Sequence, residues 1–234
     1  GVHDIDIMAG AEQSHYHRTT YNIGSGIDEY LRDNNPQVVN GEWNYVNNPQ
    51  YMANTMWKSH NSLVSYFGRL NYNLLDRYLL TATFRADGSS RFRKGKKWGY
   101  FPAAAFAWKI NNESFLKNVK WIDELKLRLG WGMTGQQNGI DDFYYTPKYT
   151  LSDTYAQYPL GDKYYQTMRP TKYNPDLTWE KTTTYNGGLD FTALNGRFGF
   201  NVDGYYRKTT DLLSEIDIAG GTNFGDKLLK NIGS

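Results

Sequence analysis

The sequence predicts an all-β fold, an antiparallel section of a transmembrane β-barrel with about seven strands, long extracellular loops and short periplasmic turns. Three observations predict this fold class. Apolar and polar side chains alternate with a period of two, short turns alternate with long polar loops along the chain, and aromatic side chains flank the short turns.

The two-residue alternation is clearest in residues 125–134. The apolar side chains, among them Leu127, occupy every second position, and Lys126 and Arg128 lie between them. Such a pattern places apolar side chains on one face of a strand and polar side chains on the other. The same pattern predicts strands at residues 4–12, 64–73, 78–87, 99–110, 177–192 and 198–207.

The connections between these strands alternate in length. Residues 74–77 and 194–197 form short turns, and residues 111–124 form an intermediate connection with room for one or two helical turns. The long polar connections are residues 22–59, 88–98, 135–176 and 210–234. Outer-membrane barrels show this alternation, because their turns are short on the periplasmic side and their loops are long outside.

Aromatic residues are abundant, with 7 Trp, 20 Tyr and 11 Phe in 234 residues. Some of them flank the shorter connections on the apolar face, as the rings of an interfacial girdle do. These pairs are Tyr72 and Tyr78, Trp108 and Trp121, and Phe191 and Phe198. Cross-strand packing beside the turns of a soluble sheet is the alternative explanation.

Composition excludes several classes of protein. The chain has no Cys, which excludes disulfide scaffolds and thiolate chemistry, and its net charge of +2 gives no signal for nucleic acid. Apolar runs are too short for a membrane-spanning helix. Because a free sheet edge cannot lie in lipid, we expect strands outside this chain to complete the barrel.

Several short motifs resemble the SusC/RagA family of TonB-linked outer-membrane transporters. They occur in family order from about residue 60 onward. They are Ser65–Tyr72 with Arg77–Leu80, Arg85–Phe92, Trp98–Pro102, Leu125–Arg128, Gly132–Gly135, Asn174–Glu180, Tyr205–Lys208 and Thr210–Leu213.

The resemblance implies a place in a larger protein. It implies a 22-stranded barrel with an N-terminal plug, of which residues 1–234 are a partial, mid-to-late barrel section without the plug or the remaining strands. It also implies active import of large nutrients, oligosaccharides or peptides, across the outer membrane of Bacteroidetes. The implied partners are a SusD-like lipoprotein lid, the plug, outer-membrane lipid and the TonB–ExbB–ExbD complex, which would act through regions outside this chain.

Two sets of residues are candidates for function. The polar face predicts a hydrated lumen of mixed charge that contacts a plug, because a selective pore would carry one sign. Its members are Arg69, Arg85, Asp87, Lys126, Arg128, Asn186 and Asp190. Loop aromatic residues, whose flat rings stack on sugars or peptides, form the second set of possible substrate or lid contacts. They are Trp43, Tyr45, Tyr144, Tyr145, Tyr155 and Tyr165; packing of the loops is the alternative role for them.

We predict no catalytic residue, cofactor or bound metal. In residues 85–91 the glycine spacing of a phosphate-binding loop is missing, so we expect a turn at Asp87-Gly88 and pairing of Arg85, Asp87 and Arg91. The histidines at 3, 15 and 17 are too few for structural zinc, and the Asp141-Asp142 pair lacks calcium-loop spacing. A soluble all-β glycan-binding or adhesion module is the alternative function; an outer-membrane enzyme is disfavoured because no nucleophile–base pair stands out.

Overall fold

The computed structural model describes residues 2–21, 38–39, 42–43, 56–151, 157–170, 172–219 and 227–233. The chain divides into two compact units, residues 1–13 with 63–234, and residues 14–62. No helix among the described residues is long and apolar enough to cross a membrane.

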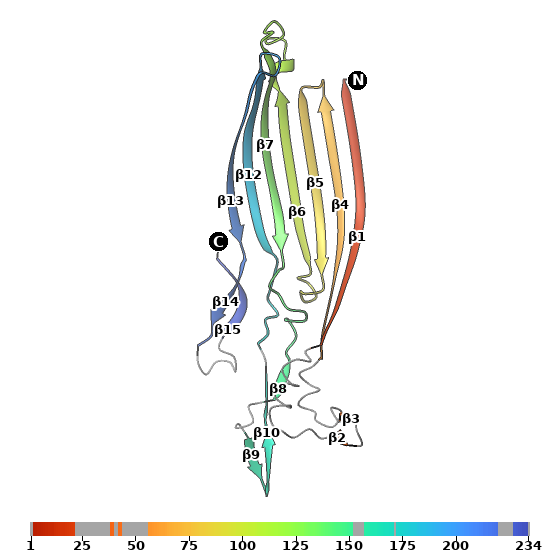
Figure 1. The fold of residues 1–234 in the computed structure, drawn as a ribbon, viewed down its shortest axis with the longest axis vertical. Helices are drawn as coiled ribbons and strands as arrows, with labels where there is room; N and C mark the ends of the chain where they lie inside the picture. The colour runs from red at the N-terminus through yellow and green to blue at the C-terminus, as the bar shows by residue number, and fades with distance from the viewer. Residues whose placement is uncertain are drawn as a thin grey trace. The chain divides into compact units, whose positions relative to one another are not determined.

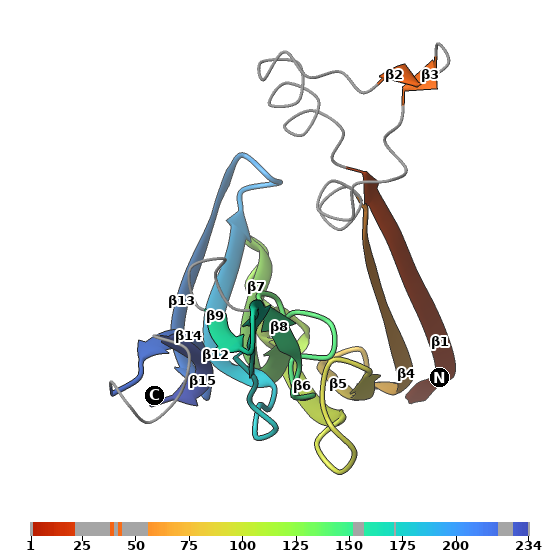
Figure 2. The same cartoon turned by 90° about the horizontal axis from the view of Figure 1, so that it is seen from below.

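A seven-stranded sheet forms the body of the structure, in the order β1-β4-β5-β6-β7-β12-β13 (Figure 1). Its strands are β1 (His3–Tyr21), β4 (Met56–Leu74), β5 (Tyr78–Ser89), β6 (Trp98–Lys109), β7 (Ile122–Gln136), β12 (Glu180–Ala193) and β13 (Phe198–Thr210). From β4 to β13 neighbouring strands are antiparallel. Figure 2, which looks along the strands, shows β13, β12, β7, β6 and β5 side by side. The predicted strands and their antiparallel order are therefore confirmed.

Short strands that the sequence did not predict lie in the long connections. They pair as small two-stranded sheets: β2 (Val38–Val39) with β3 (Glu42–Trp43), β8 (Tyr149–Leu151) with β11 (Met168–Pro170), β9 (Gln157–Leu160) with β10 (Lys163–Gln166), and β14 (Leu212–Asp217) with β15 (Lys227–Ile232). Between β6 and β7, the helical content is a single 3-10 turn, η2 (Ile110–Asn112).

The turn predicted at Asp87-Gly88 is wrong, because β5 continues through both residues. Asp87 has register partners in both neighbouring strands, Ser65 in β4 and Gly99 in β6. Pairing on both sides satisfies the backbone of this segment and overrides the local preference of Asp-Gly for a turn. The chain turns after Ser89 instead.

Strands β1 and β4 are longer than predicted and extend into residues 14–62. The additional segments are mostly polar, and their few apolar residues, such as the adjacent Met56 and Trp57, do not alternate, so a sequence pattern does not detect them. Strands β1 and β4 are hydrogen-bonded neighbours in the sheet, and in the additional segments His15 Nδ1 lies 2.7 Å from Ser62 Oγ.

The two faces of the sheet have opposite chemistry, as the alternation predicts. On the apolar face, Leu80, Phe106 and Leu129 are register partners in adjacent strands. Val202 on this face is 60% exposed although it is apolar, which indicates a surface made for contact with lipid rather than with water. On the opposite face, Lys126 is the register partner of Asp190.

Candidate functional site

Charged side chains of the polar face pair with one another. Arg128 on β7 donates to Asp190 on β12 through Nε and Nη2, at 2.8 and 2.7 Å, and Nη2 lies 2.8 Å from Asp203 Oδ1 on β13. Lys126 Nζ lies 3.7 Å from the same Asp190. The absence of a side chain at Gly188 leaves room for the Arg128 guanidinium, because a Cβ at this position would lie only 2.9 Å from Arg128 Cζ. The structure thus brings together three of the predicted lumen residues.

Arg85 is the centre of a second cluster on this face. It contacts Asp87 at 2.7 Å, Glu12 at 3.2 Å and Ser65 Oγ at 2.9 Å, and its guanidinium lies 5.6 Å from the Phe67 ring centroid. The expected pairing of Arg85 with Asp87 is present.

The other predicted members of the lumen set lie outside these two clusters. Arg91, which is not part of the lumen set and was expected to pair with Arg85 and Asp87, pairs instead with Asp142 in a loop at 3.4 Å. Arg69 donates to Asn71 at 3.0 Å, and Asn186 lies opposite Gly130, where a Cβ would crowd the amide. This face therefore carries both signs of charge in compensated groups.

Aromatic rings line the apolar face near the short turns. Tyr78 stacks on Trp108 with centroids 6.4 Å apart, and Phe191 contacts Phe198 at 6.3 Å and Trp121 at 6.2 Å. Tyr72 stacks on His3 at 6.1 Å. The rings predicted to flank the short turns thus lie on the apolar face, in contact with neighbouring rings.

A second row of rings lies nearer the loop end of the same face. Its stacked or tilted pairs are Tyr66–Trp98 at 6.0 Å, Phe84–Tyr100 at 6.1 Å and Tyr185–Tyr206 at 6.5 Å. Sequence reasoning looked for rings only beside short turns and missed this row, although its members share the parity of the first. Two rows separated along the strands are typical of a wall that meets both membrane interfaces.

Glu113, which sequence reasoning also missed, is a buried carboxylate at the turn end. Tyr78 Oη donates to it at 2.6 Å, Trp108 Nε1 at 3.0 Å and Arg77 Nη1 at 3.2 Å. The hydrogen bond from Tyr78, followed by that from Trp108, lowers the pKa of Glu113 and keeps it ionised. The carboxylate thereby fixes the orientation of two girdle rings.

At the opposite end of the sheet, two connections, residues 90–97 and 174–179, pack together with β15 (residues 227–232) into what we call the loop cluster. Its apolar core consists of Phe92, Leu177, Trp179 and Leu229 from these segments, together with Phe101 of β6 and Ile140 of the connection after β7. Phe92 is fully buried, and its ring centroid lies 5.2 Å from that of Trp179. The indole Nε1 of Trp179 donates a hydrogen bond to Lys97 O at 3.0 Å.

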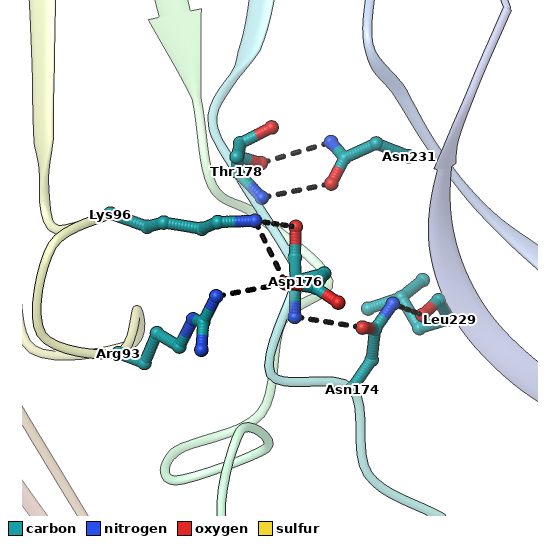
Figure 3. Close-up of polar contacts among 7 residues, drawn as sticks. All are labelled: Arg93, Lys96, Asn174, Asp176, Thr178, Leu229 and Asn231. Atoms are coloured by element: carbon teal, nitrogen blue, oxygen red, sulfur yellow. Dashed lines mark hydrogen bonds and ion pairs between the residues drawn. The ribbon is translucent and has the colours of Figure 1, made fainter.

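Polar contacts hold the loop cluster together around Asp176 (Figure 3). Arg93 and Lys96 each lie 3.0 Å from Asp176 Oδ1, and the Lys96 hydrogen bond is the largest cause of the lowered pKa of Asp176. Asn174 Nδ2 donates to Leu229 O at 3.0 Å, while Asn231 exchanges two hydrogen bonds with the backbone of Thr178, at 2.8 and 3.0 Å. The hairpin of β14 and β15 is therefore fixed against the segment that precedes β12.

The predicted loop rings have different environments. Tyr144 packs against the apolar core of the loop cluster, and its hydroxyl accepts a hydrogen bond from Leu229 N at 2.9 Å. Tyr145 contacts Phe143 at 6.4 Å, and Tyr165 stacks on Tyr158 at 5.8 Å in the hairpin of β9 and β10. Tyr45 and Tyr155 lie outside the described residues, and only the backbone of Trp43 is described.

Comparison with known proteins assigns the chain to a family. The family model described as TonB dependent receptor-like, beta-barrel, matches residues 6–234. The chain is 51% identical to the TonB-dependent receptor SusC of Bacteroides thetaiotaomicron over its whole length, and 39% identical to the TonB-dependent receptor P26 of Formosa agariphila over 172 residues, 74% of the chain.

The RagAB peptide transporter has a similar fold, with a TM-score of 0.73 at 22% identity over 99% of this chain and 24% of that chain. The chain spans about a fifth of its relatives, 22% of SusC and 17% of P26. These relatives are receptors rather than enzymes. A lipid-facing wall with a charge-compensated inner face and this sequence identity lead to one conclusion: the chain belongs to the TonB-dependent receptor β-barrel family, in its SusC/RagA group, and forms part of a barrel of the bacterial outer membrane.

Proposed function

We propose that the whole protein is a TonB-dependent transporter that imports a large nutrient, an oligosaccharide or a peptide, through this barrel. The observation that carries the proposal is the contrast between the two faces of one sheet. The outward face is apolar with two rows of rings, and the inner face pairs Arg128 with Asp190 and Arg85 with Asp87. A wall of this kind separates lipid from a hydrated passage.

The inner face supports contact with a plug. Because most of its charges already form pairs within the wall, a plug can meet it through hydrogen bonds without burying an unpaired charge. Two donors outside the ion-pair clusters are proposed for this contact: Asn186, which is neutral, and Arg69, for which the plug would supply a carboxylate. Energy coupling by a TonB–ExbB–ExbD complex would act on that plug.

Exposed rings in the loops support binding of substrate or of a SusD-like lipoprotein lid. Tyr165 is 42% exposed and stacks on Tyr158, so the pair presents an amphipathic surface that suits sugar rings or peptide side chains. We propose Tyr145 and Tyr165 as contacts, together with Trp43, Tyr45 and Tyr155. Tyr144 has the packing role instead, because its ring and hydroxyl are engaged in the loop cluster.

Uptake by cells that express the intact receptor tests this function. Labelled oligosaccharides and labelled peptides are supplied in parallel, with and without a functional TonB complex. TonB-dependent accumulation of one class supports the proposal and names the substrate class, and accumulation of neither class contradicts it.

A pair of variants tests the loop assignment. We expect Tyr165→Ala to lower substrate affinity about 5–10-fold, the loss of one stacked ring, without changing protease resistance of the loops. Tyr144→Ala should increase proteolysis at the loop cluster. An unchanged affinity in Tyr165→Ala would assign this ring to packing.

A further inference from the structure

The turn end of the sheet exposes large apolar side chains where water-exposed turns usually carry polar residues. Phe115 is 66% exposed, Trp121 and Leu194 are each 55% exposed, and Leu75 is 45% exposed. Leu75 and Leu194 also have left-handed backbones, with φ of 57° and 59°, a conformation that favours Gly and Asn. An apolar residue that is strained as well as exposed points to a functional constraint at these turns.

Backbone and side-chain contacts hold these residues at one rim. Leu194 N donates to Trp121 O at 2.9 Å, and Asn112 Nδ2 donates to Asp76 O, next to Leu75, at 2.7 Å. The turns before β5 and β13 are thereby tied to the connection between β6 and β7. Trp121 in turn contacts Phe191 of the girdle at 6.2 Å, so the rim continues the lipid-facing surface.

The rim also carries positive charge. Lys117 and Lys120 are exposed, and among the described residues neither has a carboxylate partner. Nearby carboxylates have other partners or lie on the polar face: Glu113 binds Arg77 and its ring donors, Asp123 accepts from Gly196 N at 2.9 Å, and Glu124 lies opposite Thr192 in the sheet. Apolar side chains flanked by two cations that form no ion pair within the described part of the chain match an interface of acyl chains and anionic phosphates.

We propose that this turn-end rim, Leu75, Phe115, Trp121 and Leu194 with Lys117 and Lys120, is an anchor for anionic phospholipid of the periplasmic leaflet. The apolar side chains insert below the headgroups, and the two ammonium groups bind lipid phosphate. This inference rests on the outer-membrane location and is independent of transport.

Spin labelling of the intact receptor in lipid nanodiscs tests the insertion. Residues 1–234 contain no Cys, so single substitutions Phe115→Cys and Leu194→Cys place one nitroxide each in this section of the receptor, after any Cys in the remaining sequence is replaced by Ser. Val202→Cys on the apolar face and Lys94→Cys in the loop after β5 are the lipid and water controls. We expect both rim labels to resemble Val202, with better access to oxygen than to a water-soluble nickel chelate. Rim labels that resemble Lys94 would overturn the proposal.

The preference of the receptor for an anionic lipid tests whether Lys117 and Lys120 bind lipid phosphate. In nanodiscs of phosphatidylcholine with a minor fraction of spin-labelled phosphatidylglycerol, Lys117→Gln and Lys120→Gln should each lower the preference for phosphatidylglycerol about fivefold. Lys94→Gln, a control at the other end of the sheet, should leave it unchanged. An equal preference in all three variants would show that the rim lysines do not bind phosphate.

Discussion

An arginine placed at Ala104 or at Ala105 should distinguish the two faces of the sheet. These neighbours in β6 are both exposed Ala residues, so the pair differs only in which face it occupies. Ala104 lies on the apolar face opposite Trp131, whereas Ala105 lies on the polar face opposite Gly130.

The position of Ala104 between the two rows of rings determines how much free energy of unfolding an arginine there should cost. Tyr100 and Trp108, one from each row, stand four positions before and after it in the strand. Four residues extend about 13 Å, or about 9 Å in depth at a tilt of about 45°, so Ala104 is near the centre of the apolar band. Arginine there should cost about 2–4 kcal/mol, and at Ala105 no more than about 1 kcal/mol.

A substitution at Leu127 tests how the cost of arginine depends on depth in the membrane. It is the register partner of Trp108 in the row of rings near the turns, so Leu127→Arg should cost only about 0–1 kcal/mol despite its central place in β7. The measurement is the free energy of unfolding of the intact receptor from lipid vesicles, by urea titration. Equal costs at Ala104 and Ala105 would refute the assignment of faces, and a greater cost at Leu127 than at Ala104 would refute the depth argument.

Three further predictions concern the two ends of the sheet. Phe92→Ala should destabilise the loop cluster by about 3–5 kcal/mol, because it empties a fully buried site beside Trp179, and limited proteolysis of the loops would show it. Asp176→Asn should free residues 90–97 at neutral pH, detected as greater mobility of a label at Lys94. Because the pKa of Asp176 is lowered, its ion pair contributes above the ordinary carboxyl pKa and is lost as pH falls through the lowered value, so wild type and variant should converge in acid. Glu113→Leu should lower the midpoint of thermal unfolding more than Glu113→Gln, which keeps an acceptor for Tyr78 and Trp108; equal shifts would contradict the role of those hydrogen bonds.

The strands and their faces were predictable because one local rule governs them. Successive side chains of a strand point to opposite faces. Because one face meets lipid and the other meets water, apolar and polar residues alternate along the sequence, as in residues 125–134. The rule loses its signal where a strand is mostly polar and its apolar residues do not alternate, which is why the ends of β1 and β4 were not predicted. It also placed the charges of Arg128 and Asp190 on one face, although not their distance.

The loop cluster was not predictable by such a rule, because its contacts join distant parts of the chain. Asn174 binds Leu229, 55 residues away, and Leu229 binds Tyr144, 85 residues away. Glu113 is a similar case, since its donor Tyr78 is 35 residues away, at the start of β5. Neither carboxylates nor asparagines in loops have a periodicity that would reveal such partners.

The packing of the loop cluster restricts where recognition can occur. A ring that binds a substrate must present a free face, whereas Tyr144 and Trp179 have theirs against the apolar core. The hydroxyl of Tyr144 and the indole N–H of Trp179 are also bound to backbone atoms. In the hairpin of β9 and β10, by contrast, Tyr158 and Tyr165 stack on each other and remain exposed. We therefore propose that rings outside the packed cluster, such as Tyr158 and Tyr165, are the ones that contact a substrate or lid.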